Sequence, residues 1–302
     1  MYKQFSIPDG DDDLEIDGDL ILESMTVTKL PDGLKVKGNL NLSSTTIESL
    51  PNNLEVEGDL DLSHSSILRL PGDLKVGGNL DLSHTYIESL PNNLEVGGNL
   101  ILENSDITEL PVGLRVGGDI SANRSKISKL PNELIVNGHL DLSSSKITSL
   151  PSILKVNGDI FLQETNISSI PENIEIQGSL DLSRTNISSI PDNLMVPENL
   201  DLSHTKIKSL PKGLRIGDLF CLGGSLIKEI PEDIIIKGVL MIKDSPIKSL
   251  PKGLKIGGLV LYNTNITALP EDLIVEGDVR IGKAVFIPET VKIEGRITKV
   301  KD

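Results

Sequence analysis

Apolar and polar residues alternate along most of this chain, and the alternation returns with a period of 20 residues. In one copy, Leu74 and Val76 are separated by a polar residue, and Leu80 and Leu82 are separated in the same way. An alternation of period two is typical of β-strands, because successive side chains of a strand point to opposite faces. We therefore predict two short strands in each copy, one at the L-x-V segment and one at the L-x-L segment.

A proline recurs every 20 residues from Pro31 to Pro251, each time directly after a Leu or an Ile. A unit of this length cannot bury its own apolar face and must stack on its neighbours, which is how a solenoid is built. We therefore predict a nearly all-β solenoid of about fourteen 20-residue coils with stacked parallel β-sheets.

The repeats also suggest a domain organisation. No helical or Gly/Ser-rich segment marks a second domain, so residues 1–302 are expected to form a single repeat solenoid. Regular repeats occupy residues 14–258. The acidic segment 1–13 is expected to begin an N-terminal cap, and the shortened repeats of 259–302 are expected to include a C-terminal cap.

Two small residue types recur at fixed places in the copies. Glycine, which has no side chain, recurs at one position and indicates a corner where the backbone turns or approaches another coil closely. A hydroxyl after the second strand is expected to bond the turn backbone of adjacent coils, because a buried polar group without a partner is costly. The glycines are Gly18, Gly38, Gly58, Gly78, Gly98, Gly118, Gly138, Gly158, Gly178, Gly238 and Gly258, and the hydroxyl residues are Thr45, Ser65, Thr85, Ser105, Ser125, Ser145, Thr165, Thr185, Thr205, Ser225, Ser245 and Thr264.

These residues carry a resemblance to a known repeat family. The run Leu80-Asp81-Leu82-Ser83-His84-Thr85-Tyr86-Ile87, followed by Leu90-Pro91, resembles the leucine-rich repeat core L-x-L-x-x-N-x-L, with Thr in place of the usual Asn. It is more closely similar to the V-G-G-x-L-D-L-x-x-T-x-I-x-S-L-P arrays of enterobacterial and phage proteins. The resemblance covers roughly residues 14–297. It implies a leucine-rich-repeat solenoid of bacterial or phage type that serves as a general binding scaffold.

Charge is distributed unevenly along the chain. The formal net charge is -15, and residues 1–150 hold 24 acidic and 11 basic residues, whereas residues 151–302 hold 20 and 18. Nucleic-acid binding is therefore not expected, because phosphate contacts need a basic surface. A basic protein partner, or imitation of nucleic acid toward a basic protein, fits the acidic half. A solvated surface that only keeps the sheet soluble is the alternative.

The outward positions of the second strand change character along the chain. Leucine-rich repeats usually bind through this face. Acidic residues, represented by Asp59, Asp61 and Asp81, occupy it in the first half. Later copies place apolar residues there, and such exposed patches mark interaction sites unless a cap or loop covers them. The predicted partner-binding residues are Leu219, Cys221, Val239, Met241, Val260, Phe161, Asp59, Asp61 and Asp81.

Catalytic and metal chemistry have little support in the sequence. Asp201, His204 and Cys221 are the only set that combines nucleophile, base and orienting residue types within neighbouring coils. A flat outward face implies no pocket for them, and no catalytic residue is predicted. The single Cys excludes an internal disulfide framework and a Cys-based zinc site, and neither a metal site nor a cofactor is expected.

The sequence thus favours a non-enzymatic protein-binding scaffold that uses the outward strand face. Two alternatives remain open: an acidic decoy that imitates nucleic acid to inhibit a basic host or phage protein, and a self-associating structural component. The N-terminus lacks the apolar core of a signal peptide, and no membrane-spanning run exists, so no membrane partner is expected. We expect a cytoplasmic protein, or one delivered into a host cell without a cleaved signal peptide.

Overall fold

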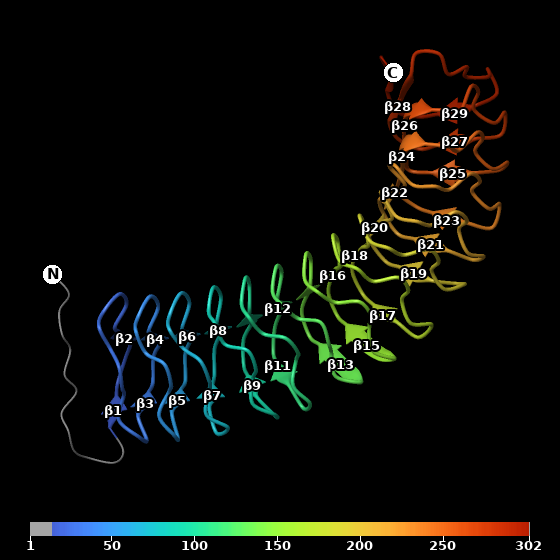
Figure 1. The fold of residues 1–302 in the computed structure, drawn as a ribbon. Helices are drawn as coiled ribbons and strands as arrows, with labels where there is room; N and C mark the ends of the chain where they lie inside the picture. Colours follow the sequence, from blue (N-terminus) through green and yellow to red (C-terminus); the bar gives the residue numbers. More distant parts are fainter. Residues whose placement is uncertain (1–13, 302) are drawn as a thin grey trace. The chain divides into compact units, whose positions relative to one another are not determined.

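The computed structural model describes residues 14–301, which form an all-β parallel solenoid of about 14 coils (Figure 1). No helix occurs in this described part of the chain. The predicted fold class is therefore confirmed. Two compact units divide the chain, Met1–Ile147 with Ile153–Gly158 and Thr148–Ser152 with Asp159–Asp302, and each is described by itself. The N-terminal cap predicted for residues 1–13 lies outside the described residues, and the other domain boundaries stay predictions.

The first unit contains two series of parallel strands, one strand of each series per coil. The L-x-L segments form the sheet β2-β4-β6-β8-β10-β12-β14, and the L-x-V segments form the sheet β1-β3-β5-β7-β9-β11, after which β13 pairs with β15. The strands are β1 (Glu15–Ile16), β2 (Leu20–Ile21), β3 (Lys35–Val36), β4 (Leu40–Asn41), β5 (Glu55–Val56), β6 (Leu60–Asp61), β7 (Lys75–Val76), β8 (Leu80–Asp81), β9 (Glu95–Val96), β10 (Leu100–Ile101), β11 (Arg115–Val116), β12 (Ile120–Ser121), β13 (Glu133–Val136), β14 (Leu140–Asp141) and β15 (Ile153–Val156).

The second unit repeats this arrangement with longer strands near its end. One sheet has the order β16-β18-β20-β22-β24-β26-β28-β30, and the other side carries the sheets β19-β21-β23 and β25-β27-β29. The strands are β16 (Ile160–Phe161), β17 (Glu175–Ile176), β18 (Leu180–Asp181), β19 (Met195–Val196), β20 (Leu200–Asp201), β21 (Arg215–Ile216), β22 (Phe220–Cys221), β23 (Ile235–Ile236), β24 (Val239–Ser245), β25 (Lys255–Ile256), β26 (Gly258–Thr264), β27 (Ile274–Val275), β28 (Val279–Gly282), β29 (Lys292–Ile293) and β30 (Ile297–Val300).

The core consists of aliphatic layers contributed by equivalent positions of successive coils. Leu60 pairs in register with Leu80, and Asp61 with Asp81, so like residues stack on like residues. Leu80 and Leu82 are completely buried, whereas Asp81 between them points outward and is half-buried. The predicted alternation therefore separates the core from the outer face of the sheet, which is the surface that could receive a partner.

Side chains fix the turn that follows each L-x-L strand. The Asp81 Oδ1 atom accepts a hydrogen bond from the Ser83 backbone N–H at 2.8 Å, and His84 adopts a left-handed φ of 57°. The buried Thr85 hydroxyl then donates to the Leu82 carbonyl at 2.6 Å. The same own-coil bond forms at seven further positions of the column, whereas the buried hydroxyls of Ser145 and Ser225 have no partner among the described residues. The prediction that the column bonds adjacent coils is therefore wrong. The same Asx turn forms at Asn41, Asp61, Asp141, Asp181 and Asp201.

A second column of Asp and Asn side chains connects successive coils directly. The Asn39 Oδ1 atom accepts the backbone N–H of Asp59 at 2.8 Å, and the Asp59 Oδ1 atom accepts that of Asn79 at 2.7 Å. This Asx ladder needs space, because a Cβ atom on Gly58 would lie 2.3 Å from the Asn39 Oδ1 atom. The glycine column therefore marks a close approach between coils, as predicted.

Candidate functional site

The predicted apolar residues of the second unit lie side by side on the outer face of the even-numbered strands. Cys221, Met241 and Val260 occupy one register row across β22, β24 and β26. Val239 begins β24, and Leu219 directly precedes β22. We call these five residues the apolar strip. The structure therefore brings together the five residues that the sequence placed near one another, from three neighbouring coils.

The apolar strip is partly accessible along its length. Leu219, Val239, Met241 and Val260 are half-buried, and Cys221 is 8% exposed. The residues that alternate with them, such as Leu240 and Leu259, are completely buried. A row of half-buried aliphatic side chains on a sheet face keeps apolar area in contact with water, and a partner could remove that area from water.

Cys221 is a packing residue rather than an activated thiol. Burial raises the pKa of the Cys221 thiol to about 12, and the charges of Asp201 and Asp181 add to the effect. The thiolate is the nucleophilic form, so this thiol stays neutral and unreactive near pH 7. Asp201 does lie in register with Cys221, as the sequence indicated. The set of Asp201, His204 and Cys221 therefore lacks an activated nucleophile.

Phe161 lies on the same face but apart from the apolar strip. It is half-buried in β16, and the in-register positions of β18 and β20 between it and Cys221 are Asp181 and Asp201. Two carboxylates thus separate this aromatic side chain from the strip. Phe161 is consequently a separate contact point rather than part of one apolar surface.

A cationic cluster that sequence reasoning missed borders the apolar strip. Tyr262 pairs in register with Lys243, and its ring centroid is 5.6 Å from the Lys243 Nζ atom and 5.8 Å from the Arg280 Cζ atom. Arg280 continues the row of Met241 and Val260 into β28. We call these three residues the Tyr262 cluster. Lys243 and Tyr262 pair at a spacing of 19 rather than 20 and occupy positions that form turns in earlier coils, which hides their alignment in the sequence.

The predicted acidic residues of the first unit have structural roles as well as charge. Asp59 is exposed and belongs to the Asx ladder. Asp61 and Asp81 are half-buried and in register, and each holds its own turn through one carboxylate oxygen. Asp61 accepts both the backbone N–H and the hydroxyl of Ser63, at 2.9 and 2.7 Å. These hydrogen bonds explain why Asp recurs at these positions independently of any partner.

Two histidines stand next to these aspartates. The imidazole rings of His64 and His84 are stacked, with centroids 4.3 Å apart and planes 8° from parallel. Both residues occupy the left-handed turn position of their coils. Within residues 14–301, no group of three or more His, Cys, Asp or Glu side chains could hold a metal ion. The histidine pair therefore lacks the third ligand that a metal centre would need.

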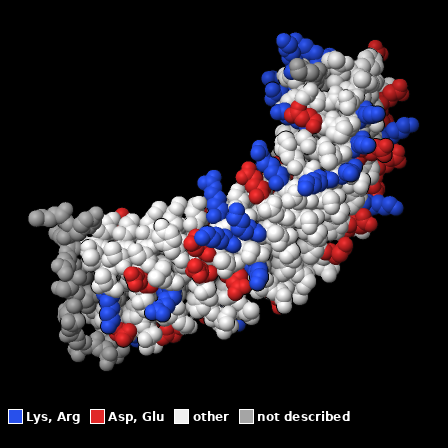
Figure 2. All heavy atoms as spheres, in the orientation of Figure 1, with Lys and Arg blue, Asp and Glu red and all other residues white. Residues whose placement is uncertain are grey.

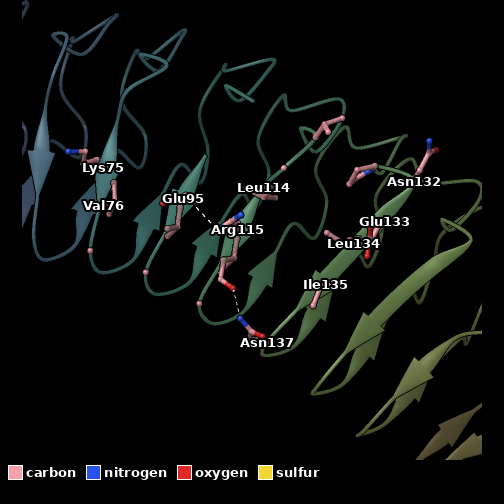
Figure 3. A pocket seen from close by; sticks show the side chains of 18 residues that line it. Lys75, Val76, Glu95, Leu114, Arg115, Asn132, Glu133, Leu134, Ile135 and Asn137 are labelled. Carbon is pink, nitrogen blue, oxygen red and sulfur yellow. Dashed lines mark hydrogen bonds and ion pairs between the residues drawn. The ribbon is translucent and has the colours of Figure 1, made fainter. Parts of the chain in front are cut away.

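A groove of about 1080 Å³ lies on the opposite side of the first unit, where the hydrogen-bonded sheet ends at β11 and β13 begins the next pair (Figure 3). The Asn137 side-chain amide spans this break by donating to the Val116 carbonyl at 3.1 Å. Arg115 pairs with Glu95 at 3.6 Å, and Lys75 pairs with Glu55 at 2.7 Å. Much of the charge around the groove is therefore already neutralised within the protein.

Acidic and basic side chains are interspersed on the face drawn in Figure 2 rather than gathered into a field of one sign. Interspersed charge of this kind does not form the continuous basic stripe that follows a phosphate backbone. The described residues contain no helix of the length and apolar character needed to cross a membrane.

Comparisons with known proteins bear on the fold alone. No protein-family model and no curated protein matches the chain. A leucine-rich repeat protein from Bacteroides thetaiotaomicron is similar in structure, with a TM-score of 0.50 and 15% identity over 87% of this chain and 38% of the other. YopM, a leucine-rich effector protein from Yersinia pestis, has a TM-score of 0.49 and 17% identity over 93% of this chain and 88% of its own. A leucine-rich repeat protein from Leptospira interrogans has a TM-score of 0.48 and 18% identity over 89% of this chain and 91% of its own. The architecture is thus similar to that of bacterial leucine-rich repeat proteins.

Proposed function

We propose that this protein is a non-enzymatic scaffold that binds a protein partner through the outer face of its even-numbered strands. The observation that carries the proposal is the apolar strip of Leu219, Cys221, Val239, Met241 and Val260, whose members lie in neighbouring register positions of the second unit. A few residues that become fully desolvated near the centre of an interface supply most of its affinity.

The rigidity of the sheet supports this role. Each strand of the face is hydrogen-bonded to its neighbours, and the alternate residues Phe220, Leu240 and Leu259 are completely buried beneath it. A surface built in this way has little conformational freedom to lose on binding. Affinity therefore depends mainly on the fit of the partner.

The carboxylates of Asp59, Asp61 and Asp81 have a different part in the proposal. Surface charges of this kind influence the rate and the orientation of association more than the affinity. We propose that they guide a partner that presents basic residues toward the first unit, with Phe161 as a further contact in the second unit. We also propose that the protein meets this partner in the cytoplasm of the producing cell or of a host cell.

A pull-down from bacterial lysate tests the proposal. The bait is the wild-type protein or the double variant Val239→Asp/Met241→Asp, at low salt and at about 0.5 M salt, where surface charge is largely screened. The matched control is Met195→Asp/Ile235→Asp, which places the same two charges at exposed apolar positions of the odd-numbered strands. Any captured protein is purified and its direct binding to the three baits is measured.

Partner binding that survives salt, persists in the control and is lost in Val239→Asp/Met241→Asp is the expected result. Equal binding by all three proteins would remove the apolar strip from the proposed site. Binding that is retained by Val239→Asp/Met241→Asp and lost in salt would instead favour an acidic decoy that acts through the first unit. Light scattering at rising protein concentration separates both outcomes from self-association.

A further inference from the structure

The apolar strip and the Tyr262 cluster are parts of one continuous surface. β24 and β26 are each seven residues long, whereas most strands of the array have two. Their outward residues therefore form two rows: Met241, Val260 and Arg280 in one, and Lys243 with Tyr262 in the next. Aliphatic side chains and two cations consequently lie side by side on a single stretch of sheet.

The two cations of this surface are only partly neutralised. Lys243 Nζ lies 3.7 Å from the Asp244 carboxylate, and both side chains are more than two-fifths exposed. Arg280 is exposed and forms no ion pair with any described carboxylate. Asp278, two residues earlier in the chain, uses its Oδ1 atom to accept the Arg296 backbone N–H at 2.8 Å. The guanidinium of Arg280 thus keeps its fork of N–H donors free for another molecule.

Tyr262 lies between the strands that carry the two cations. Its half-buried ring lies within 6 Å of each cationic group, and Lys243 approaches it from β24 and Arg280 from β28, the strands on either side of β26. An acidic segment that crosses these strands would meet a cation on each side of the ring, and Arg280 could bind a carboxylate through two parallel hydrogen bonds. The adjacent Met241 and Val260 would at the same time contact an apolar side chain next to that carboxylate.

We propose that this surface binds an acidic segment of a partner protein, in which Glu or Asp residues engage Arg280 and Lys243 while a neighbouring apolar residue covers Met241 and Val260. The proposal rests on the proposed function, because it names the partner chemistry of the same face. Two cations beside aliphatic side chains fit a carboxylate-bearing peptide better than a nucleic acid, which needs a longer basic track.

Selection from a random-peptide phage library on the immobilised full chain tests the proposal. Parallel selections use Arg280→Glu, Val239→Asp/Met241→Asp and the control Lys292→Glu, which reverses an exposed charge in β29 on the odd-strand side. The strongest peptide is then synthesised in two forms, as selected and with every Asp and Glu replaced by Asn and Gln. Binding of both forms is measured by fluorescence anisotropy, and circular dichroism confirms that each variant is folded.

The expected peptides carry net negative charge together with apolar residues. Arg280→Glu and the carboxylate-free peptide should each weaken binding at least tenfold, an effect of about 1.4 kcal/mol, whereas Lys292→Glu should change it less than about twofold. Arg280→Lys should give an intermediate loss, because Lys keeps the charge without the planar fork.

Several results would overturn the inference. Peptides that are neutral or basic, yet need Met241 and Val239, would refute the acidic partner and leave the proposed function standing. Equal losses in Arg280→Glu and Lys292→Glu would show a general charge effect. A single-stranded oligonucleotide that displaces the peptide and binds more tightly would replace the peptide as occupant. No enrichment on wild type over the Val239→Asp/Met241→Asp variant would count against both proposals.

Discussion

At the scale of single residues, the Asx ladder and the glycine column depend on each other. The Asx ladder places an Asn or Asp oxygen against the backbone of the next coil, and the glycine column leaves room for that oxygen. The oxygen of Asn39 therefore accounts for both the backbone pairing of Asp59 and the absence of a side chain at Gly58. A change at either residue should disturb the other.

The variant Gly58→Ala should lower the free energy of unfolding by about 1–3 kcal/mol, because its methyl group would lie 2.3 Å from the Asn39 Oδ1 atom and 2.7 Å from the Gly38 carbonyl oxygen. Gly72→Ala is the matched control, since a Cβ atom there meets nothing within 4 Å. Urea unfolding curves measure both. A loss no greater in Gly58→Ala than in Gly72→Ala would contradict the steric explanation.

At the scale of strands, the outer face changes where the side chains no longer hold the turn and the ladder. Asn199 still accepts the Leu219 N–H at 3.1 Å, but Leu219 and Val239 have no oxygen with which to continue the ladder. Cys221 takes the outward position that Asp201 and Asp181 hold in the preceding coils. Leu219, Val239 and Cys221 belong to the apolar strip, and they lack the side-chain oxygen that holds the turn or the ladder in earlier coils.

The buried thiol of Cys221 should lower the free energy of unfolding as the pH rises into the alkaline range. Its pKa is about 12 in the folded protein against an ordinary value of 9.0, so the unfolded chain releases this proton first. Between these values the folded state binds more protons, and the free energy of unfolding should fall by up to about 1.4 kcal/mol per pH unit as pH rises. Below pH 9 the effect is absent.

The difference in unfolding free energy between wild type and Cys221→Ala, measured from pH 8 to pH 10.5, isolates this effect from other titrating groups. The wild-type advantage should shrink as pH rises. A constant difference would show that the thiol titrates normally in the folded protein.

At the scale of the whole molecule, an excess of negative charge opposes folding. The net charge is -15, and the first unit stacks Asp61 directly on Asp81. Two such charges repel by about 1 kcal/mol in water, less when salt screens them. The protein should therefore be more stable at moderate than at low ionic strength.

The melting temperature of the wild type should rise between low salt and about 0.15 M salt, and the rise should be smaller in Asp61→Asn/Asp81→Asn. Asn can hold the same turn, as Asn41 does by accepting the Ser43 N–H at 2.9 Å. Serine substitutions at Asp272 and Glu289, which are exposed in the second unit, provide a control of equal charge change. The same salt response in both double variants would contradict a role for the stacked pair.

The sequence predicted the coil, the two strands and the alternation of Leu80, Asp81 and Leu82, because the same pattern recurs in every copy. It did not give the partner of the Thr85 hydroxyl, since residue spacing contains no information about the direction of a hydrogen bond. The Tyr262 cluster was missed for another reason. Val239 pairs with Gly258 at a spacing of 19, and Lys243 and Tyr262 occupy positions that form turns in earlier coils. Only the extended strands β24 and β26 turn these side chains outward.

The Asx ladder has an evolutionary consequence. Each coil from Asn39 to Asp119 presents an acceptor to the next coil and a backbone donor to the previous one, so its two surfaces are matched to any copy of itself. Tandem duplication or loss of such a coil by recombination would leave every junction intact. Around Leu219 and Val239 the coils are no longer interchangeable, because these side chains cannot accept the ladder hydrogen bond from a neighbouring coil. Related chains should therefore differ in the number of coils before this region, and the order of the coils within the region should stay the same.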